Sequence, residues 1–203
     1  MAGFDPSTYL DNDDALEEII DDIPKLISVR DFAQKTQTVR WFQEVGEAPD
    51  EELMTVARAY LDALGFPHVE IALIADWEDA ESAAESPDWD TAGWEAEEQL
   101  RSALVSEALL DLSEEALSVA LNHVSAAAGL GLQEHVENIA AIWDIENQNL
   151  MNAAAGAAVQ ACHQAALVLA SEAEDDHPLA LKFRLFEMGR WLISIAGSIF
   201  NIF

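Results

Sequence analysis

The sequence predicts a mainly α-helical fold, a multi-helix bundle that ends in a segment with a β-hairpin pattern. Apolar residues recur at spacings of three and four along most of the chain, which is typical of helices with one buried face. Apolar residues make up 51% of the 203 residues, and six of them are tryptophans, so a large core can form without disulfides or metals. We find no internal repeat and no linker, so residues 1–203 are expected to form a single acidic helical domain.

The first third of the chain is expected to contain three helices. A short apolar stripe covers residues 16–23 and ends at Pro24, which cannot continue a helix interior. A second helix is predicted over 29–45, where glycine and proline follow closely as stop signals. A third covers 50–64, with acidic residues in its first turn and apolar residues on one face. Residues 66–76 fit both a helix and a strand, and we interpret them as a helix.

Two further helices and a shorter apolar stripe are predicted in the middle of the chain. The first helix covers 97–112, and Ser113 is then expected to cap the start of the next. Gly129 and Gly131 are interpreted as its end, because glycine is common just after a helix. A separate apolar stripe follows over 136–143.

The last third combines small and large apolar residues. Residues 153–170 are rich in alanine, so this helix can approach its neighbours closely and is expected at the centre of the bundle. Another helix is predicted over 179–186, after Pro178. Residues 191–203 alternate apolar side chains around Ala196-Gly197, which indicates a hairpin, with a terminal helix as the alternative. In either form we expect this segment to pack as core.

The charge is the most unusual property of the sequence. Its 39 acidic and 9 basic residues give a net charge of −30, whereas small soluble domains carry a magnitude of about 2 to 8. Such a charge repels nucleic acids and anionic membranes and accelerates association with a cationic partner. The first 100 residues carry −21 of this net charge and the remainder −9. This asymmetry predicts an acidic patch.

The densest acidic segment covers residues 76–98, which contain ten carboxylates, three tryptophans and no basic residue. Tryptophan supplies large apolar anchors at interfaces, while carboxylates pair with Arg or Lys of a partner. The alternative is a solvated acidic loop whose tryptophans fold back onto the core. The predicted partner-binding residues are Asp76, Trp77, Glu78, Asp79, Glu81, Glu85, Asp88, Trp89, Asp90, Trp94, Glu95, Glu97 and Glu98.

No pattern in the sequence indicates an enzyme, a metal site or a cofactor. The acidic run from Asp11 to Asp22 lacks the glycine and the glutamate that a calcium loop needs at its sixth and twelfth positions. The histidines form neither an HExxH motif nor paired ExxH motifs, and Glu174 and His177 make one isolated ExxH. Cys162 is the only cysteine and is interpreted as buried packing. No catalytic residue, metal or cofactor is therefore predicted.

These observations favour a non-enzymatic acidic binding protein that occludes a basic partner, as an immunity protein or antitoxin does to a toxin or nuclease. The alternatives are a DNA mimic that inhibits a DNA-binding protein, a halophile-adapted helical protein, and a metal enzyme without a recognisable motif. The single cysteine fits a reducing compartment, and the first residues show no secretory signal pattern, so we expect a cytoplasmic location. No direct nucleic-acid or membrane contact is expected.

Overall fold

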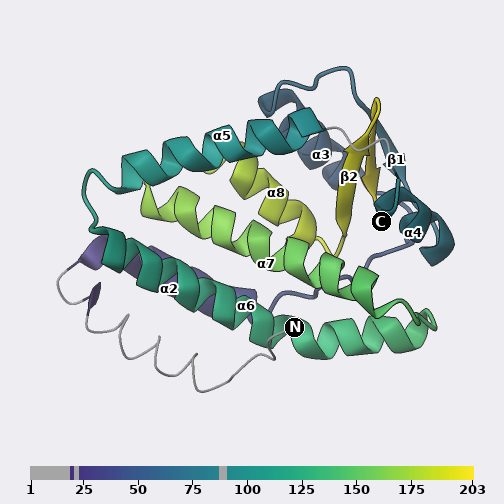
Figure 1. The fold of residues 1–203 in the computed structure, drawn as a ribbon, viewed down its shortest axis with the longest axis horizontal. Helices are drawn as coiled ribbons and strands as arrows, with labels where there is room; N and C mark the ends of the chain where they lie inside the picture. Colours follow the sequence, from purple (N-terminus) through teal and green to yellow (C-terminus); the bar gives the residue numbers. More distant parts are fainter. Residues whose placement is uncertain (1–18, 21–22, 87–90) are drawn as a thin grey trace.

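The computed structural model describes residues 19–20, 23–86 and 91–203 of the chain. It confirms the mainly α-helical fold class, with a small sheet at one end of the bundle (Figure 1). In chain order the elements are the 3₁₀ turn η1 (Pro24–Leu26), α2 (Ile27–Thr36), α3 (Glu51–Ala63), β1 (Glu70–Leu73), α4 (Trp77–Ala84), α5 (Thr91–Ala108), α6 (Glu114–Ile142), α7 (Gln148–Ala170), α8 (Pro178–Glu187), β2 (Leu192–Ala196) and β3 (Ile199–Ile202).

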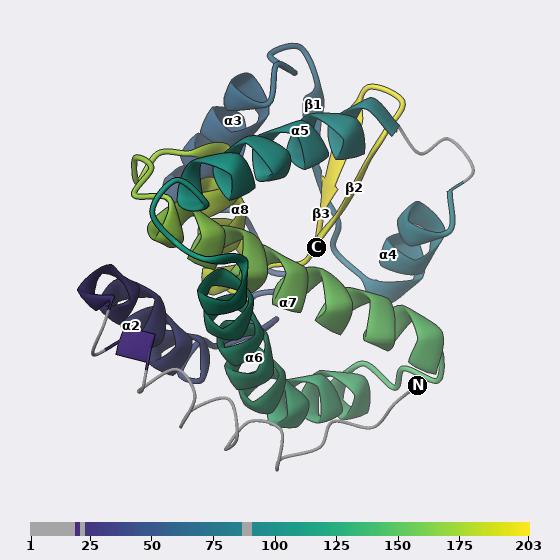
Figure 2. The ribbon, with the colours of Figure 1, turned by 60° about the vertical axis from the view of Figure 1, so that its left-hand side comes forward.

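Helix α7 is the centre of the bundle, as its alanine content predicts. It packs against α2, α5, α6 and α8, and Figures 1 and 2 show it running between α5 and α6. Fully buried alanines such as Ala158, Ala161 and Ala166 let these helices approach closely. By length and composition α7 is apolar enough to cross a membrane, but 56% of its apolar window is buried inside the protein. This burial is that of a core helix in a soluble protein.

Side chains cap several of the helix starts, and the cap at Ser113 is the one that the sequence predicted. The Asp50 carboxylate accepts a hydrogen bond from the backbone N–H of Leu53 at 2.7 Å, and Ser113 Oγ accepts one from Ala116 at 3.1 Å. Both satisfy backbone donors that the first turn of a helix leaves free. At α8 the proline is the first helical residue, and His177 Nδ1 accepts from the Leu179 N–H at 3.2 Å. The isolated histidine of the ExxH motif is therefore engaged in capping.

The helix predicted over 29–45 is too long, because α2 ends at Thr36. The chain then turns back so that Trp41 becomes fully buried, and its indole N–H donates to the Thr36 carbonyl at 3.3 Å. Phe42 adopts a left-handed backbone conformation, with φ of 60°, which a regular helix cannot include. The apolar residues after Thr36 are buried because the turn packs onto the core, and their spacing is not that of a helix. The helix predicted over 16–23 lies mostly outside the described residues.

Gly129 and Gly131 do not end a helix, contrary to the prediction, and α6 runs unbroken through both to Ile142. The stripe over 136–143 therefore belongs mainly to the second half of the same helix. A Cβ atom on Gly131 would lie 2.8 Å from the Gln37 Cα and 2.9 Å from the Thr36 carbonyl oxygen. Gly131 is thus needed where the end of α2 crosses α6 at close range.

The C-terminal hairpin is confirmed, but the helix predicted over 66–76 is wrong. Strands β2 and β3 are antiparallel and joined by two residues, of which Gly197 has a φ of +59°, as two-residue hairpins favour. Residues 70–73 form β1, which pairs in parallel with β3 and gives the sheet order β1-β3-β2. The hairpin side chains Leu192, Phe200 and Ile202 are buried in the core, as predicted.

Candidate partner-binding surface

The structure distributes the thirteen predicted partner-binding residues between the surface and the interior. Asp88, Trp89 and Asp90 lie outside the described residues. Asp76 caps α4 by accepting a hydrogen bond from the Asp79 N–H at 3.0 Å. Glu81 accepts one from the Asn147 side chain at 2.5 Å. The predicted residues that are exposed to solvent are Asp76, Glu78, Asp79, Glu85, Trp94 and Glu95.

Trp77 points into the protein. Its ring stacks on Trp191 with a centroid distance of 5.8 Å and an interplanar angle of 26°, and it lies 6.2 Å from the Phe203 ring. These contacts attach α4 to the C-terminal strands, and side chains of this size dominate the energetics of a core. Trp77 therefore folds back onto the core, which is the alternative that the sequence left open.

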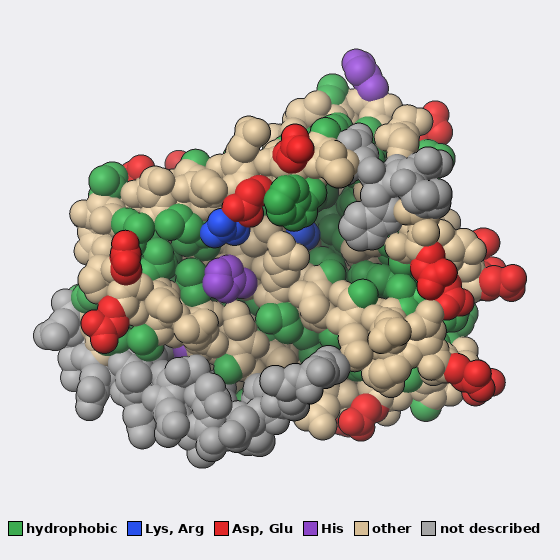
Figure 3. Space-filling view, in the orientation of Figure 1, with side chains coloured by type: hydrophobic (Ala, Val, Ile, Leu, Met, Phe, Trp, Pro, Cys, Tyr) green, Lys and Arg blue, Asp and Glu red, His purple; other side chains and the backbone are tan. Residues whose placement is uncertain are grey.

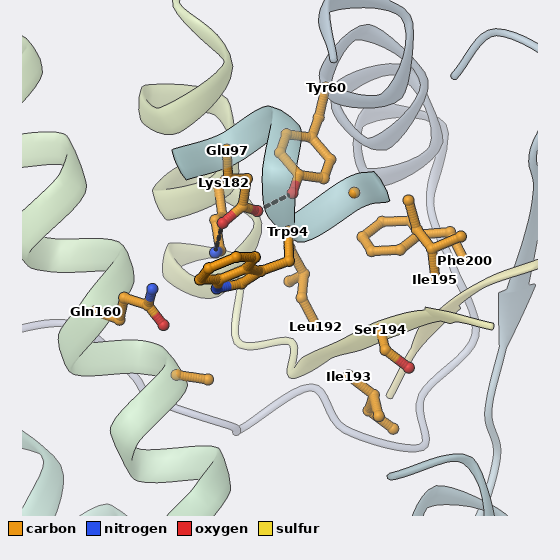
Figure 4. Close-up of a pocket in the computed structure, with 12 residues that line it drawn as sticks. Tyr60, Trp94, Glu97, Gln160, Lys182, Leu192, Ile193, Ser194, Ile195 and Phe200 are labelled. Atoms are coloured by element: carbon orange, nitrogen blue, oxygen red, sulfur yellow. Dashed lines mark hydrogen bonds and ion pairs between the residues drawn. The ribbon is translucent and has the colours of Figure 1, made fainter. Parts of the chain in front are cut away.

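Glu97 is the buried centre of a polar cluster that joins four helices. The Tyr60 hydroxyl donates to one oxygen of its carboxylate, and Lys182 Nζ lies 2.6 Å from the other. The Gln164 amide also donates to this second oxygen, at 3.3 Å. The carboxylate thus holds α5 against α3, α7 and α8 (Figure 4).

The buried cluster satisfies the conditions under which an interior charge is tolerated. The side chains of Glu97 and Lys182 are 11% and 12% exposed, so each charge has lost most of its hydration and depends on the other. Burial, together with the neighbouring Glu97 carboxylate, raises the pKa of Tyr60 well above its usual range. The tyrosine therefore stays protonated and keeps donating to Glu97. Sequence reasoning missed the partners of Glu97, although one signal was visible: Lys182 stands alone between apolar neighbours in α8.

Trp94 behaves in the opposite way to Trp77, with 63% of its surface exposed. It lies one turn before Glu97 on α5, at the rim of a cavity of about 190 Å³. The cavity is bordered by α5, α7, α8 and the hairpin, and Leu192, Ile195 and Phe200 supply apolar walls. Figure 4 shows the indole beside the Glu97–Lys182 pair, with the hairpin residues across from it. An exposed tryptophan beside a cavity combines the two parts of an interface hot spot.

The described residues of α4 and α5 carry many more carboxylates than bases. Among the described residues of α4 and α5 the only base is Arg101, which donates to the Glu98 carboxylate at 2.8 Å and lowers the pKa of that carboxyl. Glu78, Asp79, Glu85 and Glu95 are exposed, and none of them lies within ion-pair distance of a base in the described chain. Figure 3 shows acidic side chains at the end of the molecule formed by α4. These four carboxylates are therefore solvated and lack a cation partner within the described chain.

Cys162 and His163 do not form a catalytic pair. Cys162 is fully buried, as predicted, and burial raises the pKa of its thiol. His163 faces a separate groove between α5, α6 and α7, where its Nδ1 lies 3.3 Å from Ser125 Oγ. Among the residues that the structure describes, no three His, Cys, Asp or Glu side chains converge as metal ligands would.

No protein-family model, curated protein or solved structure matches this chain. A functional assignment must therefore come from the site itself. The name Trp94 face is used below for Trp94, the adjoining cavity, and the exposed carboxylates Glu78, Asp79, Glu85 and Glu95.

Proposed function

We propose that the protein is a non-enzymatic binding protein that occludes a basic partner with the Trp94 face, as an immunity protein or antitoxin occludes a toxin or nuclease. The observation that carries the proposal is the exposure of Trp94. Tryptophan is highly buried on average, yet 63% of this side chain remains in water next to a cavity. A partner that covers it gains the apolar area that folding has left exposed.

The charge of the protein favours a basic partner. Six of the nine basic side chains pair with carboxylates of the residues that the structure describes. With 39 carboxylates and only nine bases, most carboxylates have no basic side chain to pair with inside the protein. Counter-ions or a basic partner must balance their charge. A cationic protein approaching such a surface is steered towards it, and its association is slowed by salt. A cytoplasmic location belongs to the same proposal and is supported by the single, buried cysteine.

The test is affinity capture from a lysate of the source cells at low salt, with four forms of the protein as bait. The first is wild type, and the second is Trp94→Ala. The third neutralises the exposed carboxylates of the face, with Glu78→Gln, Asp79→Asn, Glu85→Gln and Glu95→Gln. The fourth, a matched control, neutralises four exposed carboxylates near the start of α6 and after α7, at the end away from α4 (Figure 1): Glu115→Gln, Glu174→Gln, Asp175→Asn and Asp176→Asn.

We expect wild type and the matched control to retain the same basic protein, and the other two baits to lose it. Elution by salt and a 1:1 complex with the purified partner would then support the proposal. Equal retention by both neutralised baits would contradict it, because the charge would act without a defined site. Displacement of the partner by duplex DNA would identify the DNA-mimic version. A protein that keeps no partner and folds fully only in molar salt would instead be halophile-adapted.

A further inference from the structure

We infer that the cavity beside Trp94 receives an aromatic side chain of the basic partner, flanked by Lys or Arg residues that stay on the acidic rim. This inference rests on the proposed function and specifies what the partner must present. It follows from the size of the cavity, the neutrality of its polar wall, and the position of Trp94 at its mouth.

The size and walls of the cavity fit a phenyl-sized group. Its volume is about 190 Å³, and an apolar cavity of about 150 Å³ is large enough to bind benzene. Leu192 and Ile195 supply aliphatic surface, while Phe200 and Trp94 supply aromatic surface. Aromatic rings gain from offset or edge-to-face contacts with such neighbours, beyond the area they bury. A phenylalanine or tyrosine side chain is therefore the best complement.

The polar wall of the cavity is neutral despite the acidity of the protein. Both oxygens of the Glu97 carboxylate are occupied, one by Tyr60 and the other by Lys182 and Gln164. An ammonium or guanidinium group entering the cavity would meet the Lys182 ammonium and would have to displace it. Cationic groups of the partner are accordingly better placed outside, near Glu95 and the exposed face of Trp94, where cation–π and carboxylate contacts are open to them.

The occupant is expected to be part of a polypeptide. A small molecule that fills the cavity would leave the outward surface of Trp94 in water, since 63% of this residue is exposed. A protein segment covers the indole and the rim together. A second copy of this chain is disfavoured, because two molecules of net charge −30 repel each other.

The experiment compares short capped peptides by isothermal titration calorimetry at low salt. The probes are Lys-Lys-Phe-Lys-Lys, Lys-Lys-Ala-Lys-Lys and Glu-Glu-Phe-Glu-Glu. Binding is measured to wild type, to Ala157→Leu, which places three extra carbons in the cavity from α7, and to Gly156→Ala as a matched control. A Cβ atom at Gly156 meets nothing within 4 Å, so this neighbouring change leaves the cavity intact.

We expect the cationic phenylalanine peptide to bind wild type about tenfold or more tightly than the cationic alanine peptide, as burial of a phenyl ring implies. This preference should disappear in Ala157→Leu and persist in Gly156→Ala. Equal binding of the two cationic peptides to wild type, or a preference that Ala157→Leu leaves unchanged, would overturn the inference while charge-driven binding stands. Tight binding of the glutamate peptide would instead contradict the basic partner of the proposed function.

Discussion

Removing the ammonium of Lys182 should expose how strongly the protein depends on its buried ion pair. In Lys182→Met the side-chain volume is largely kept, but the Glu97 carboxylate loses the cation 2.6 Å away. Both side chains are about nine-tenths buried, so water in the adjoining cavity can replace only part of the lost interaction. Breaking a buried pair costs about 3 to 5 kcal/mol. For a chain of about 200 residues this lowers Tm by about 6 to 20 °C, at about 2 to 4 °C per kcal/mol.

The double variant Glu97→Gln/Lys182→Met tests whether this cost comes from the orphaned charge. The glutamine keeps an oxygen for the Tyr60 hydroxyl, and no uncompensated charge remains in the interior. We expect the double variant to be clearly more stable than Lys182→Met alone, because neutral replacement of a buried pair is often tolerated. Stability is measured by urea unfolding at fixed salt for wild type, both single variants and the double variant.

The matched control is Arg184→Met on the same helix. It removes the same unit of charge, but Arg184 and its partner Glu52 are 51% and 60% exposed, so the expected loss is at most about 1 kcal/mol. If Arg184→Met destabilises the protein as much as Lys182→Met, the effect is one of net charge. If the double variant loses the sum of the two single losses to within about 0.5 kcal/mol, the residues are not coupled and the reasoning fails.

Three further predictions concern backbone packing, pH and salt. Gly131→Ala should destabilise the protein by about 1 to 3 kcal/mol, since the added methyl group meets the backbone at the end of α2. Gly156→Ala, in open space, should stabilise it by about 0.5 to 1 kcal/mol. Urea unfolding that ranks the two variants the other way would contradict this packing. Because folding raises the pKa of Tyr60, the stability that its protonated hydroxyl contributes is complete below about pH 10 and is lost as the pH rises through the folded-state pKa. Above about pH 10 the free energy of unfolding should therefore fall less steeply with pH for Tyr60→Phe than for wild type. Raising NaCl from about 0.01 to 0.15 M shortens the Debye length from about 30 to 8 Å and should raise Tm by screening the net charge of −30; a Tm that does not change would mean that self-repulsion is unimportant.

Local patterns predict those parts of the fold that depend on neighbouring residues. The start of α3 at Asp50 and the start of α6 at Ser113 follow from capping chemistry within four residues. The hairpin follows from alternation around a glycine. Strand β1 is different, because Glu70 to Leu73 pair with residues 199–202, and no local period can reveal a pairing partner more than a hundred positions away. The helix end predicted at Gly131 is wrong for the same reason, since the glycine is needed for its contact with the distant end of α2.

The candidate site shows the same division between local and distant information. The sequence identifies an acidic segment with tryptophans, but it cannot separate Trp77, which stacks inside, from Trp94, which is exposed. On α5 the apolar Trp94 faces water while the charged Glu97, one turn later, is buried. Patterns of hydrophobicity assign these two positions the reverse way. The burial of Glu97 depends on distant partners, since Lys182 reaches it from α8 and Tyr60 from α3.

The neutralised interior and the acidic exterior would give the two parts of the Trp94 face different tasks in binding. Exposed charges act over several ångströms and mainly change the rate of encounter. A ring held in the cavity changes mainly the rate of dissociation, where most affinity differences among related complexes arise. Neutralising Glu78, Asp79, Glu85 and Glu95 should therefore slow association and weaken its salt dependence, whereas filling the cavity through Ala157→Leu should speed dissociation. The Glu97–Lys182 pair would make this separation possible, because it would keep the carboxylate in the cavity wall from attracting the cations that the rim is proposed to bind.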